Sequence, residues 1–322
     1  MSAPDFSIVI PTHNRPAMLA EALDSLRNQT GTSLEAIVVD DASTPAVDAA
    51  VLGTLQGQPV HLIRNEASSG GAASKTAGAR LAQGRFIGFL DDDDLLHPDY
   101  VAALTRAFDT HPDIDVFFVD VEWFGDNPKA SDRNHRAATE AVIAATGHER
   151  APDGSILFRS GLLEALVRST PMQFQRPVLR REVLERVGGF RPDCLLWDCD
   201  WAIRAALQVR CAYLPQPLYR QREQGQGYYT KPGRALATAT SIYEITERLY
   251  RRPPIALDAA TRALLQRLAA LKAFDVAYLH SLQGDVAAAL RHWWQSQRLQ
   301  PSLSPSRLRL PLGALWRALK AA

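Results

Sequence analysis

An apolar run that ends in four consecutive aspartates places the strongest constraint on this chain. Residues 85–90 are Arg-Phe-Ile-Gly-Phe-Leu, and Asp91–Asp94 follow directly. The run predicts a buried strand, and adjacent carboxylates repel one another unless a cation such as Mg²⁺ or Mn²⁺ neutralises them. Mg²⁺ completes its coordination with substrate phosphates, so we predict a metal–phosphate site at the carboxyl end of a strand, where open α/β sheets bind ligands. The alternative is a solvated acidic turn, or an acidic start to the helix expected from Pro98.

Short apolar runs alternate with helix-like patterns through the first half of the chain. This alternation predicts an α/β fold, a Rossmann-like and mainly parallel sheet flanked by helices. Strands are expected at residues 6–10, 36–39, 60–63, 86–90 and 116–119. Helices are expected from Pro16, over residues 72–82 and from Pro98.

The second half of the sequence divides into three stretches. Residues 126–154 are polar and rich in alanine, and we expect an insertion or mobile loop that carries substrate contacts. Helices follow near residues 162–167 and 198–207, and from Ala235 the pattern is almost wholly helical. No second copy recurs at a repeat period, so we predict a helical hairpin packed on the α/β domain. The expected domains are residues 1–230, divided near residue 122, and a helical extension over residues 231–322.

Length and composition exclude several classes of protein. The 322 residues are enough for one large α/β domain with an appendage. Lysine and arginine (36) nearly balance aspartate and glutamate (35), which argues against a dedicated nucleic-acid binder. The three cysteines, Cys194, Cys199 and Cys211, are odd in number and lack the spacing of a disulfide framework, which suits a reducing compartment. We expect them to be small apolar residues of the core. The first residues do not resemble a secretory signal, and no apolar run approaches the ~20 residues of a membrane helix.

The end of the sequence is basic and apolar. No acidic residue follows Asp285, whereas six basic residues are interleaved there with leucines and Trp316. Such a segment can lie on an anionic membrane surface or pack on its own domain, and we favour packing.

Three further polar sites follow predicted strands or turns. The segment Pro11–Arg15 (Pro-Thr-His-Asn-Arg) ends the first strand, Asp40–Asp41 ends the second, and Asp198 with Asp200 follows a Gly-Gly turn. Side chains at one edge of a sheet can meet in space while they lie far apart in sequence. Together with the run at Asp91–Asp94, these sites predict a single polar cleft.

Over roughly residues 5–225 the chain resembles glycosyltransferase family 2, whose members have the GT-A fold. The resemblance rests on motifs in the family's order and spacing: Ile8–Arg15, Val38–Ser43, Gly70, Lys75 and Gly78 through Gly84, Phe86–Pro98, Val187–Phe190 and Trp197–Arg204. It implies a metal-dependent, inverting transfer of a sugar from a nucleotide-sugar donor, most naturally UDP-linked, to an acceptor hydroxyl. When the family's positions are carried over to this sequence, the residues expected to line the nucleotide-sugar pocket are Pro11, Thr12, Asn14, Arg15, Asp40, Asp41, Lys75, Asp91, Asp92 and Arg222.

The resemblance also assigns individual roles. Asp41 would hydrogen-bond the base, and Asp93, with Asp91 as a further ligand, would hold Mg²⁺ or Mn²⁺. Asp198 matches the catalytic base, which takes a proton from the acceptor hydroxyl. Its neighbour Trp197, with Asp200, would contact the acceptor or sugar.

Two positions depart from the family pattern. Trp197 stands directly before Asp198, where the family usually has an acidic residue. The bulk of its side chain is expected to desolvate Asp198 and so to raise the pKa of this base. Arg222 stands where many relatives have a metal-ligating histidine. An arginine cannot bind a cation but can pair with the diphosphate. The alternative is that Arg220 and Arg222 are solvated surface residues.

Two other functions compete with this interpretation. A sugar nucleotidyltransferase would share the metal–phosphate site, but the residues after the first strand lack its Gly-rich, basic pattern. A non-catalytic nucleotide-sugar-binding or scaffold protein would not need the intact Asp198. By resemblance, the acceptor is a glycan or lipid-linked glycan of the cell surface, and the enzyme is cytoplasmic. Peripheral contact of the basic tail with the inner face of the plasma membrane is the alternative to packing of that tail on its own domain. The sequence leaves the donor sugar, the linkage and the oligomeric state open.

Overall fold

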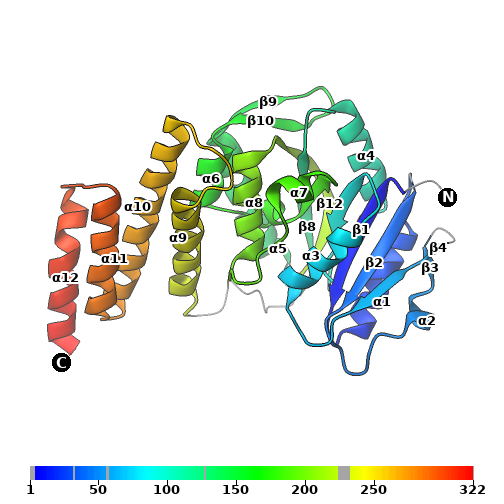
Figure 1. The fold of residues 1–322 in the computed structure, drawn as a ribbon, viewed down its shortest axis with the longest axis horizontal. Coiled ribbons are helices and arrows are strands. Elements are labelled where there is room, and N and C mark those ends of the chain that lie inside the picture. Colours follow the sequence, from blue (N-terminus) through cyan, green and yellow to red (C-terminus); the bar gives the residue numbers. More distant parts are fainter. Residues whose placement is uncertain (1–3, 32, 56–57, 127, 224–232, 322) are drawn as a thin grey trace. The chain divides into compact units, whose positions relative to one another are not determined.

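The computed structural model describes residues 4–31, 33–55, 58–126, 128–223 and 233–321. These residues form two compact units (Figure 1). Residues 1–193 and 197–225 belong to the first, or α/β, unit, and residues 194–196 and 226–322 belong to the second, or helical, unit.

A mixed sheet with strand order β5-β2-β1-β6-β11-β8-β12-β10-β9 forms the centre of the α/β unit, and β7 pairs with β12. Its strands are β1 (Phe6–Thr12), β2 (Leu34–Asp40), β5 (His61–Arg64), β6 (Phe86–Phe89), β7 (Leu95–Leu96), β8 (Val116–Gly125), β9 (Gly147–Arg150), β10 (Ile156–Ser160), β11 (Pro177–Arg180) and β12 (Cys211–Glu223). The first four in spatial order are parallel. A separate two-stranded sheet contains β3 (Thr54–Leu55) and β4 (Gln58–Pro59). The predicted α/β class is confirmed.

The chain order of the parallel strands creates a switch point between β1 and β6. From β1 the chain moves outward to β2 and β5, and it then returns to form β6 on the other side of β1. Loops that leave the carboxyl ends of β1 and β6 therefore diverge, and open α/β sheets bind their ligands in the crevice so formed.

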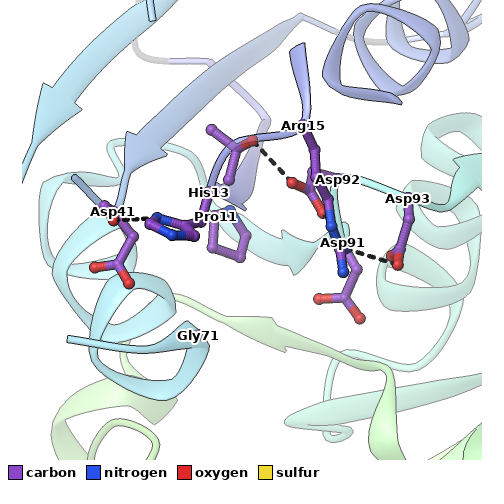
Figure 2. Close-up of a pocket in the computed structure, with 9 residues that line it drawn as sticks. Pro11, His13, Arg15, Asp41, Gly71, Asp91, Asp92 and Asp93 are labelled. Carbon is purple, nitrogen blue, oxygen red and sulfur yellow. Dashed lines mark hydrogen bonds and ion pairs between the residues drawn. The ribbon is translucent and has the colours of Figure 1, made fainter. Parts of the chain in front are cut away.

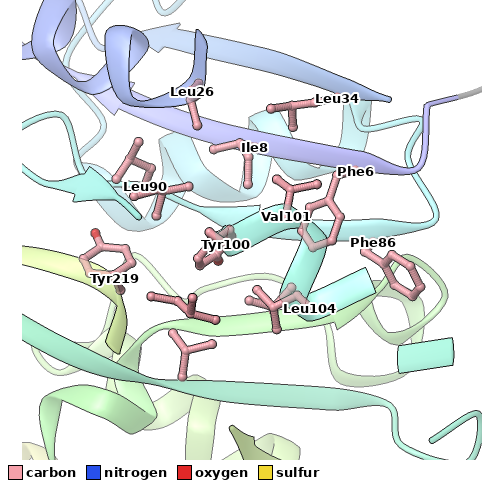
Figure 3. Close-up of a cluster of buried hydrophobic side chains, with 14 of the residues drawn as sticks. Phe6, Ile8, Leu26, Leu34, Phe86, Leu90, Tyr100, Val101, Leu104 and Tyr219 are labelled. Atoms are coloured by element: carbon pink, nitrogen blue, oxygen red, sulfur yellow. The ribbon is translucent and has the colours of Figure 1, made fainter. Parts of the chain in front are cut away.

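Helices cover both faces of this sheet. They are α1 (Pro16–Arg27), α2 (Ala49–Leu52), α3 (Gly71–Leu81), α4 (Tyr100–Thr110), α5 (Pro128–Ala144), α6 (Leu162–Arg168), the 3₁₀ turn η1 (Met172–Gln175), α7 (Val183–Val187) and α8 (Trp197–Gln208). Alternate residues of β1 point to opposite faces. Ile8 and Ile10 join the main hydrophobic core with residues of α1 and α4 (Figure 3). Val9 faces α3, where a side chain at Gly78 would overlap it.

The predicted insertion or loop at residues 126–154 is wrong where the structure describes it. Residues 128–144 form α5, and residues 147–150 form the edge strand β9. Among the residues of α5 whose side chains are described, 132–144, only those of the last turns bury a stripe, at Thr139, Val142 and Ile143. An i, i+3, i+4 stripe of this kind, confined to one end of a helix, gives too weak a periodicity to detect in the sequence.

The helical unit contains α9 (Ala235–Arg251), α10 (Ala259–Leu282), α11 (Val286–Leu299) and α12 (Pro305–Ala321). The described part of this region is thus four helices rather than the single hairpin that we predicted. Asp258 and Asp285 begin α10 and α11, and each carboxylate accepts a hydrogen bond from a backbone N–H of the first turn. Over the described residues, no helix combines the length and hydropathy that crossing a bilayer requires.

Candidate active site

A polar cleft of about 480 Å³ opens at the switch point between β1 and β6 (Figure 2). It collects side chains from four loops: the ends of β1, β2 and β6, and the start of α3. The cleft is lined by Pro11, Thr12, His13, Arg15, Asp41, Gly71, Asp91, Asp92 and Asp93. Of the ten predicted nucleotide-sugar residues, the structure thus brings six to this cleft, together with the predicted metal ligand Asp93.

Arg15 joins the β1 loop to the acidic run. One of its guanidinium nitrogens, Nη1, lies 3.0 Å from a carboxylate oxygen of Asp92 and 2.8 Å from one of Asp93. The Thr12 hydroxyl donates to the other oxygen of Asp92 at 2.8 Å. Burial raises the pKa of Asp92 and outweighs the effects of these partners. The loops after β1 and β6 are therefore connected at the site through side-chain hydrogen bonds.

Two cations hold Asp91 on the other side of the run. Lys75 Nζ lies 2.5 Å from one carboxylate oxygen, and Arg176 Nη2 lies 3.1 Å from the other. Both cationic side chains are almost fully buried. Burial opposes ionisation of Asp91, but the charges of Lys75 and Arg176 outweigh it and lower its pKa. Asp91 is therefore an anchored anion at the floor of the cleft.

Asp94 points away from the cleft and into the protein. Its carboxylate accepts hydrogen bonds from the Tyr219 hydroxyl and the Arg222 backbone N–H, each at 2.8 Å. Burial raises its pKa, against the charge of Arg176 and with the help of the charge on Asp91. The fourth aspartate thus fixes β12 to the acidic run, which explains why the run is longer than a ligand site requires.

Arg222 also helps to fix β12 to the acidic run. Its Nε donates to the Asp93 carbonyl at 2.7 Å, its guanidinium pairs with Glu21 of α1, and it lies over the Phe124 ring. The alternative of a solvated Arg222 is wrong, because these contacts bury most of the side chain.

Asp41 organises the loop that precedes α3. Its carboxylate accepts hydrogen bonds from the backbone N–H groups of Ser69 and Gly70, and from the side chains of Asn65 and Ser68. Burial opposes ionisation, but these donors outweigh it and hold the pKa of Asp41 well below its usual range. His13 Nδ1 lies 2.7 Å from the Asp41 carbonyl oxygen (Figure 2). The Asp41 carboxylate therefore holds the loop before α3, which forms a wall of the cleft, and the Asp41 carbonyl contacts His13 in the loop after β1.

Two predicted pocket residues serve the loops rather than the cleft. Asp40 is fully buried, and its carboxylate accepts from the backbone N–H groups of Ser43 and Val47 and pairs with Arg64. Asn14 has a positive φ of 56°, and its side-chain oxygen accepts from the Thr44 backbone N–H at 2.6 Å. Asparagine tolerates this left-handed backbone better than most residues. Asn14 therefore ties the turn after β1 to the turn after β2, and Asp40 holds the turn after β2 in place.

The base candidate Asp198 lies at the first turn of α8. Partial burial raises the pKa of Asp198, as expected beside Trp197, while the charges of Arg176 and Lys75 oppose the shift. The Trp197 ring packs over Lys75 Nζ at 4.9 Å from the ring centroid. The two cations that hold Asp91 are thus also those whose charges act on Asp198. Asp198 itself is not part of the cleft lining at Asp41 and Asp93.

Asp200 lies behind this turn instead of facing a ligand. It is fully buried and accepts from Arg204 Nε at 2.7 Å, and Arg204 also donates to backbone carbonyls, including that of Gly189 at 2.8 Å. The pair fixes the start of α8 to the Gly-Gly turn. Asp200 therefore orients the helix that carries Asp198.

Sequence reasoning missed Arg176, the residue that connects the parts of the site. Its Nη2 lies 2.7 Å from Gln221 Oε1 on β12 and 3.7 Å from an Asp94 oxygen, in addition to the Asp91 contact. Arg176 follows η1 and precedes β11, outside every motif. An isolated arginine before a short strand gives no sequence signal that distinguishes it from a surface residue.

Comparison with known proteins agrees with this geometry. The profile of "Glycosyl transferase family 2" matches residues 7–184, more than half of the chain. The chain belongs to glycosyl transferase family 2. An uncharacterized glycosyltransferase of Haemophilus influenzae is 37% identical over 35% of this chain and 37% of its own length. The O-antigen biosynthesis protein RfbC of Myxococcus xanthus is 29% identical over 77% of this chain and 18% of its own. The chain thus covers little more than a third, or less, of the first relatives that it matches.

Solved structures of other glycosyltransferases share the fold. Staphylococcus aureus TarS in complex with UDP-GlcNAc superposes with a TM-score of 0.64, at 18% identity, over 98% of this chain and 88% of its own. The mannosyltransferase PcManGT of Pyrobaculum calidifontis, in complex with GDP-Man and Mn²⁺, gives 0.57 at 18% identity, over 99% and 88%. At this identity the likeness shows the GT-A fold and nothing finer.

Proposed function

We propose that this chain is an inverting glycosyltransferase that moves a sugar from a UDP-linked donor to a hydroxyl of a glycan or lipid-linked glycan in cell-surface glycan synthesis. The observation that carries the proposal is the shared position of Asp41, Arg15 and the acidic run in one cleft at the switch point of the sheet. The complexes of TarS with UDP-GlcNAc and of PcManGT with GDP-Man support a nucleotide-sugar as the donor. The role of RfbC in O-antigen biosynthesis supports a surface glycan as the product.

Donor binding follows from the residues that line the cleft. The nucleotide lies along the β1 loop, between Pro11 and the Asp41 loop, and the diphosphate extends toward the acidic run. The free face of the Arg15 guanidinium is oriented to meet phosphate oxygens, because half of the side chain remains exposed. The backbone N–H groups at the start of α3, from Gly71 onward, add a favourable dipole for an anion.

Asp91 and Asp93 are the residues that would hold Mg²⁺ or Mn²⁺. Both carboxylates line the cleft and keep about a quarter of their surface exposed, and Mg²⁺ commonly takes one or two carboxylates and completes its shell with phosphate oxygens and water. The donor set therefore fits a hard cation. When bound, such a cation neutralises the charge that builds on the leaving diphosphate.

Asp198 acts as the general base in this scheme. Its carboxylate takes the proton of the acceptor hydroxyl as the acceptor oxygen forms a bond to the anomeric carbon. The bond from that carbon to the phosphate oxygen breaks, and UDP leaves with the electron pair. The raised pKa of Asp198 makes it a stronger base than an exposed aspartate. The charges of Arg176 and Lys75 act on both Asp91 and Asp198, which supports a place for this base near the diphosphate end of the cleft. We place the reaction in the cytoplasm.

A thermal-shift screen tests the donor assignment. The full chain is heated with UDP, GDP or dTDP, each with and without Mn²⁺, because a ligand that binds the native state raises its melting temperature. We expect the largest shift with UDP and Mn²⁺, and loss of most of it in Arg15→Gln. A larger shift with GDP would replace the assigned base, and no shift with any nucleotide would refute the proposal. Turnover of a UDP-sugar, followed as UDP release, distinguishes an enzyme from a binding protein.

A further inference from the structure

The last 37 residues differ in charge from the rest of the chain. All 35 acidic residues precede Val286, whereas six of the 36 lysines and arginines follow it. The segment 286–322 therefore carries a formal charge of +6 and the residues before it carry −5. An interaction with an anionic surface would be confined to this segment, because the remainder is repelled.

The same segment exposes large apolar side chains. In the helical unit, Trp294 on α11 is 57% exposed, and Leu303, Leu308 and Leu312, in the turn and on α12, are 84%, 46% and 70% exposed. Arg298 and Arg309, in the same stretch of 19 residues, are also exposed. We call these six residues the basic apolar surface. Large apolar side chains that are exposed within one short stretch, with arginines between them in the sequence, are typical of interaction sites rather than of a solvated segment.

Hydrogen bonds hold this surface in place. The Gln297 side chain donates to the Ser302 carbonyl at 3.0 Å and accepts from its N–H at 2.8 Å. Trp293 Nε1 donates to the Arg307 carbonyl at 2.7 Å and so ties α11 to the first turn of α12. The leucine at position 303 is therefore presented by an ordered turn.

The helix α12 already has a packed face. Leu310 and Ala314 are buried among the helices of this unit, which agrees with the packing that we favoured from the sequence. Leu308 and Leu312 lie two residues from Leu310 along the helix, on the opposite side. The exposed leucines are therefore not needed for the fold of the helical unit.

We propose that the basic apolar surface docks on a bilayer that contains anionic phospholipid. Arginine next to leucine and tryptophan is the composition of helices that lie in the membrane interface, and tryptophan is enriched at the level of the headgroups. Charge selects this occupant over a second copy of the chain, because a symmetric contact would bring two surfaces of the same positive charge together. The proposal concerns the helical unit and does not depend on the assigned donor or base.

Vesicle sedimentation of the full chain tests this proposal. We expect binding to vesicles of phosphatidylcholine with about one third phosphatidylglycerol, no binding to phosphatidylcholine alone, and release at high salt. In the variant R309Q/L312S, the loss of one charge should weaken vesicle binding about fivefold. The loss of the leucine should weaken it further, so we expect the affinity for these vesicles to fall at least about tenfold.

A matched variant controls for the loss of charge and apolar surface as such. R80Q/L81S removes the same two residue types from the exposed end of α3, in the α/β unit, and should bind vesicles like the unaltered chain. Both variants should keep their melting temperature and their UDP-dependent thermal shift, which separates failure here from failure of the proposed function. Equal binding to neutral vesicles, no binding at all, or the same loss in both variants would overturn the proposal. So would self-association of the chain that R309Q/L312S abolishes, since the surface would then join two copies.

Discussion

The two sides of the α/β unit satisfy their buried polar groups differently. Over the described part of residues 4–122, which carry the predicted nucleotide half, no buried side-chain nitrogen or oxygen lacks a hydrogen-bond partner. Among the described residues of 123–223, seven such atoms lack a hydrogen bond, on Trp123, Thr139, Gln173, Gln175, Arg176, Arg191 and Asp200, although the atoms of Arg191 and Asp200 form an ion pair with each other at 3.7 Å. Because an unpaired buried polar atom costs about 1–3 kcal/mol, the second side gives up stability that the first retains.

This difference indicates two kinds of site. The aspartates at the ends of β2 and β6 are fixed by hydrogen bonds from backbone groups, neighbouring side chains and buried cations before any ligand is present. Such a site is preorganised, and little reorganisation is needed when charge develops. On the other side, buried donors and acceptors of the turn η1, Arg176 and α5 lack a hydrogen-bond partner, so this part of the unit is less tightly fixed. The difference fits the proposed function, in which residues 4–122 bind the donor and residues 123–223 bind the acceptor.

The largest expected effect is on the reaction itself, in Asp198→Asn. The amide cannot take the acceptor proton, so we expect kcat for sugar transfer to fall about 10²–10⁴-fold. The UDP-dependent thermal shift should persist, because Asp198 lies outside the lining of the preorganised cleft. Steady-state UDP release measures the fall in kcat, and the UDP-dependent thermal shift measures whether nucleotide binding is kept.

The pH dependence of the unaltered chain provides the internal control for that variant. Because burial raises the pKa of Asp198, the rate should fall on acidification at a pH above the ordinary aspartate value of about 3.9. The remaining activity of Asp198→Asn should lack this acid limb. If the variant keeps full activity, or keeps the limb, another group is the base.

A smaller effect, on stability, is expected for Asp41→Asn. The neutral amide replaces one acceptor by a donor that faces the N–H groups of Ser69 and Gly70. We expect a loss of about 1.5–3 kcal/mol in the free energy of unfolding at neutral pH, the value for hydrogen bonds to a charged group. Urea unfolding measures this loss.

The pH dependence of that loss has a definite sign. The folded state lowers the pKa of Asp41, so its stabilising contribution is complete above the unfolded value of about 3.9 and declines as the pH falls below it. The difference between Asp41→Asn and the unaltered chain should therefore shrink on acidification. A difference that is constant with pH would show that the carboxylate charge is not what holds the loop.

The same contrast explains what could be predicted from the sequence. Residues such as Asp41 and Asp91–Asp94 lie at the ends of apolar runs. Because each run predicts a strand, the sequence predicts these residues at the edge of a sheet. Their partners come from elsewhere in the chain, and no local pattern identifies them. Asp40 and Asp41 are adjacent and chemically identical, yet one caps a buried turn and the other lines the cleft.

In residues 123–223, local patterns carry less information. The described part of α5 buries only a short stripe, so its alanine-rich sequence resembles a loop. Arg176 lies outside every motif, and its importance arises from long-range contacts to Asp91 and Gln221. Charge neutralisation at the acidic run therefore depends on tertiary contacts, and the structure was needed to identify them.

The smallest expected effects come from a matched pair that tests the contrast itself. Thr12 and Thr139 are both buried, but the Thr12 hydroxyl donates to Asp92 whereas the Thr139 hydroxyl has no hydrogen-bond partner. Valine is nearly the same shape as threonine without the hydroxyl. Thr12→Val should cost about 1–3 kcal/mol, because it removes a hydrogen bond to a buried carboxylate. Thr139→Val should cost nothing, or stabilise by up to about 1 kcal/mol, because it removes an unpaired polar atom. Urea unfolding of both variants measures the difference, and equal losses would mean that the two sides of the unit do not differ in hydrogen-bond satisfaction.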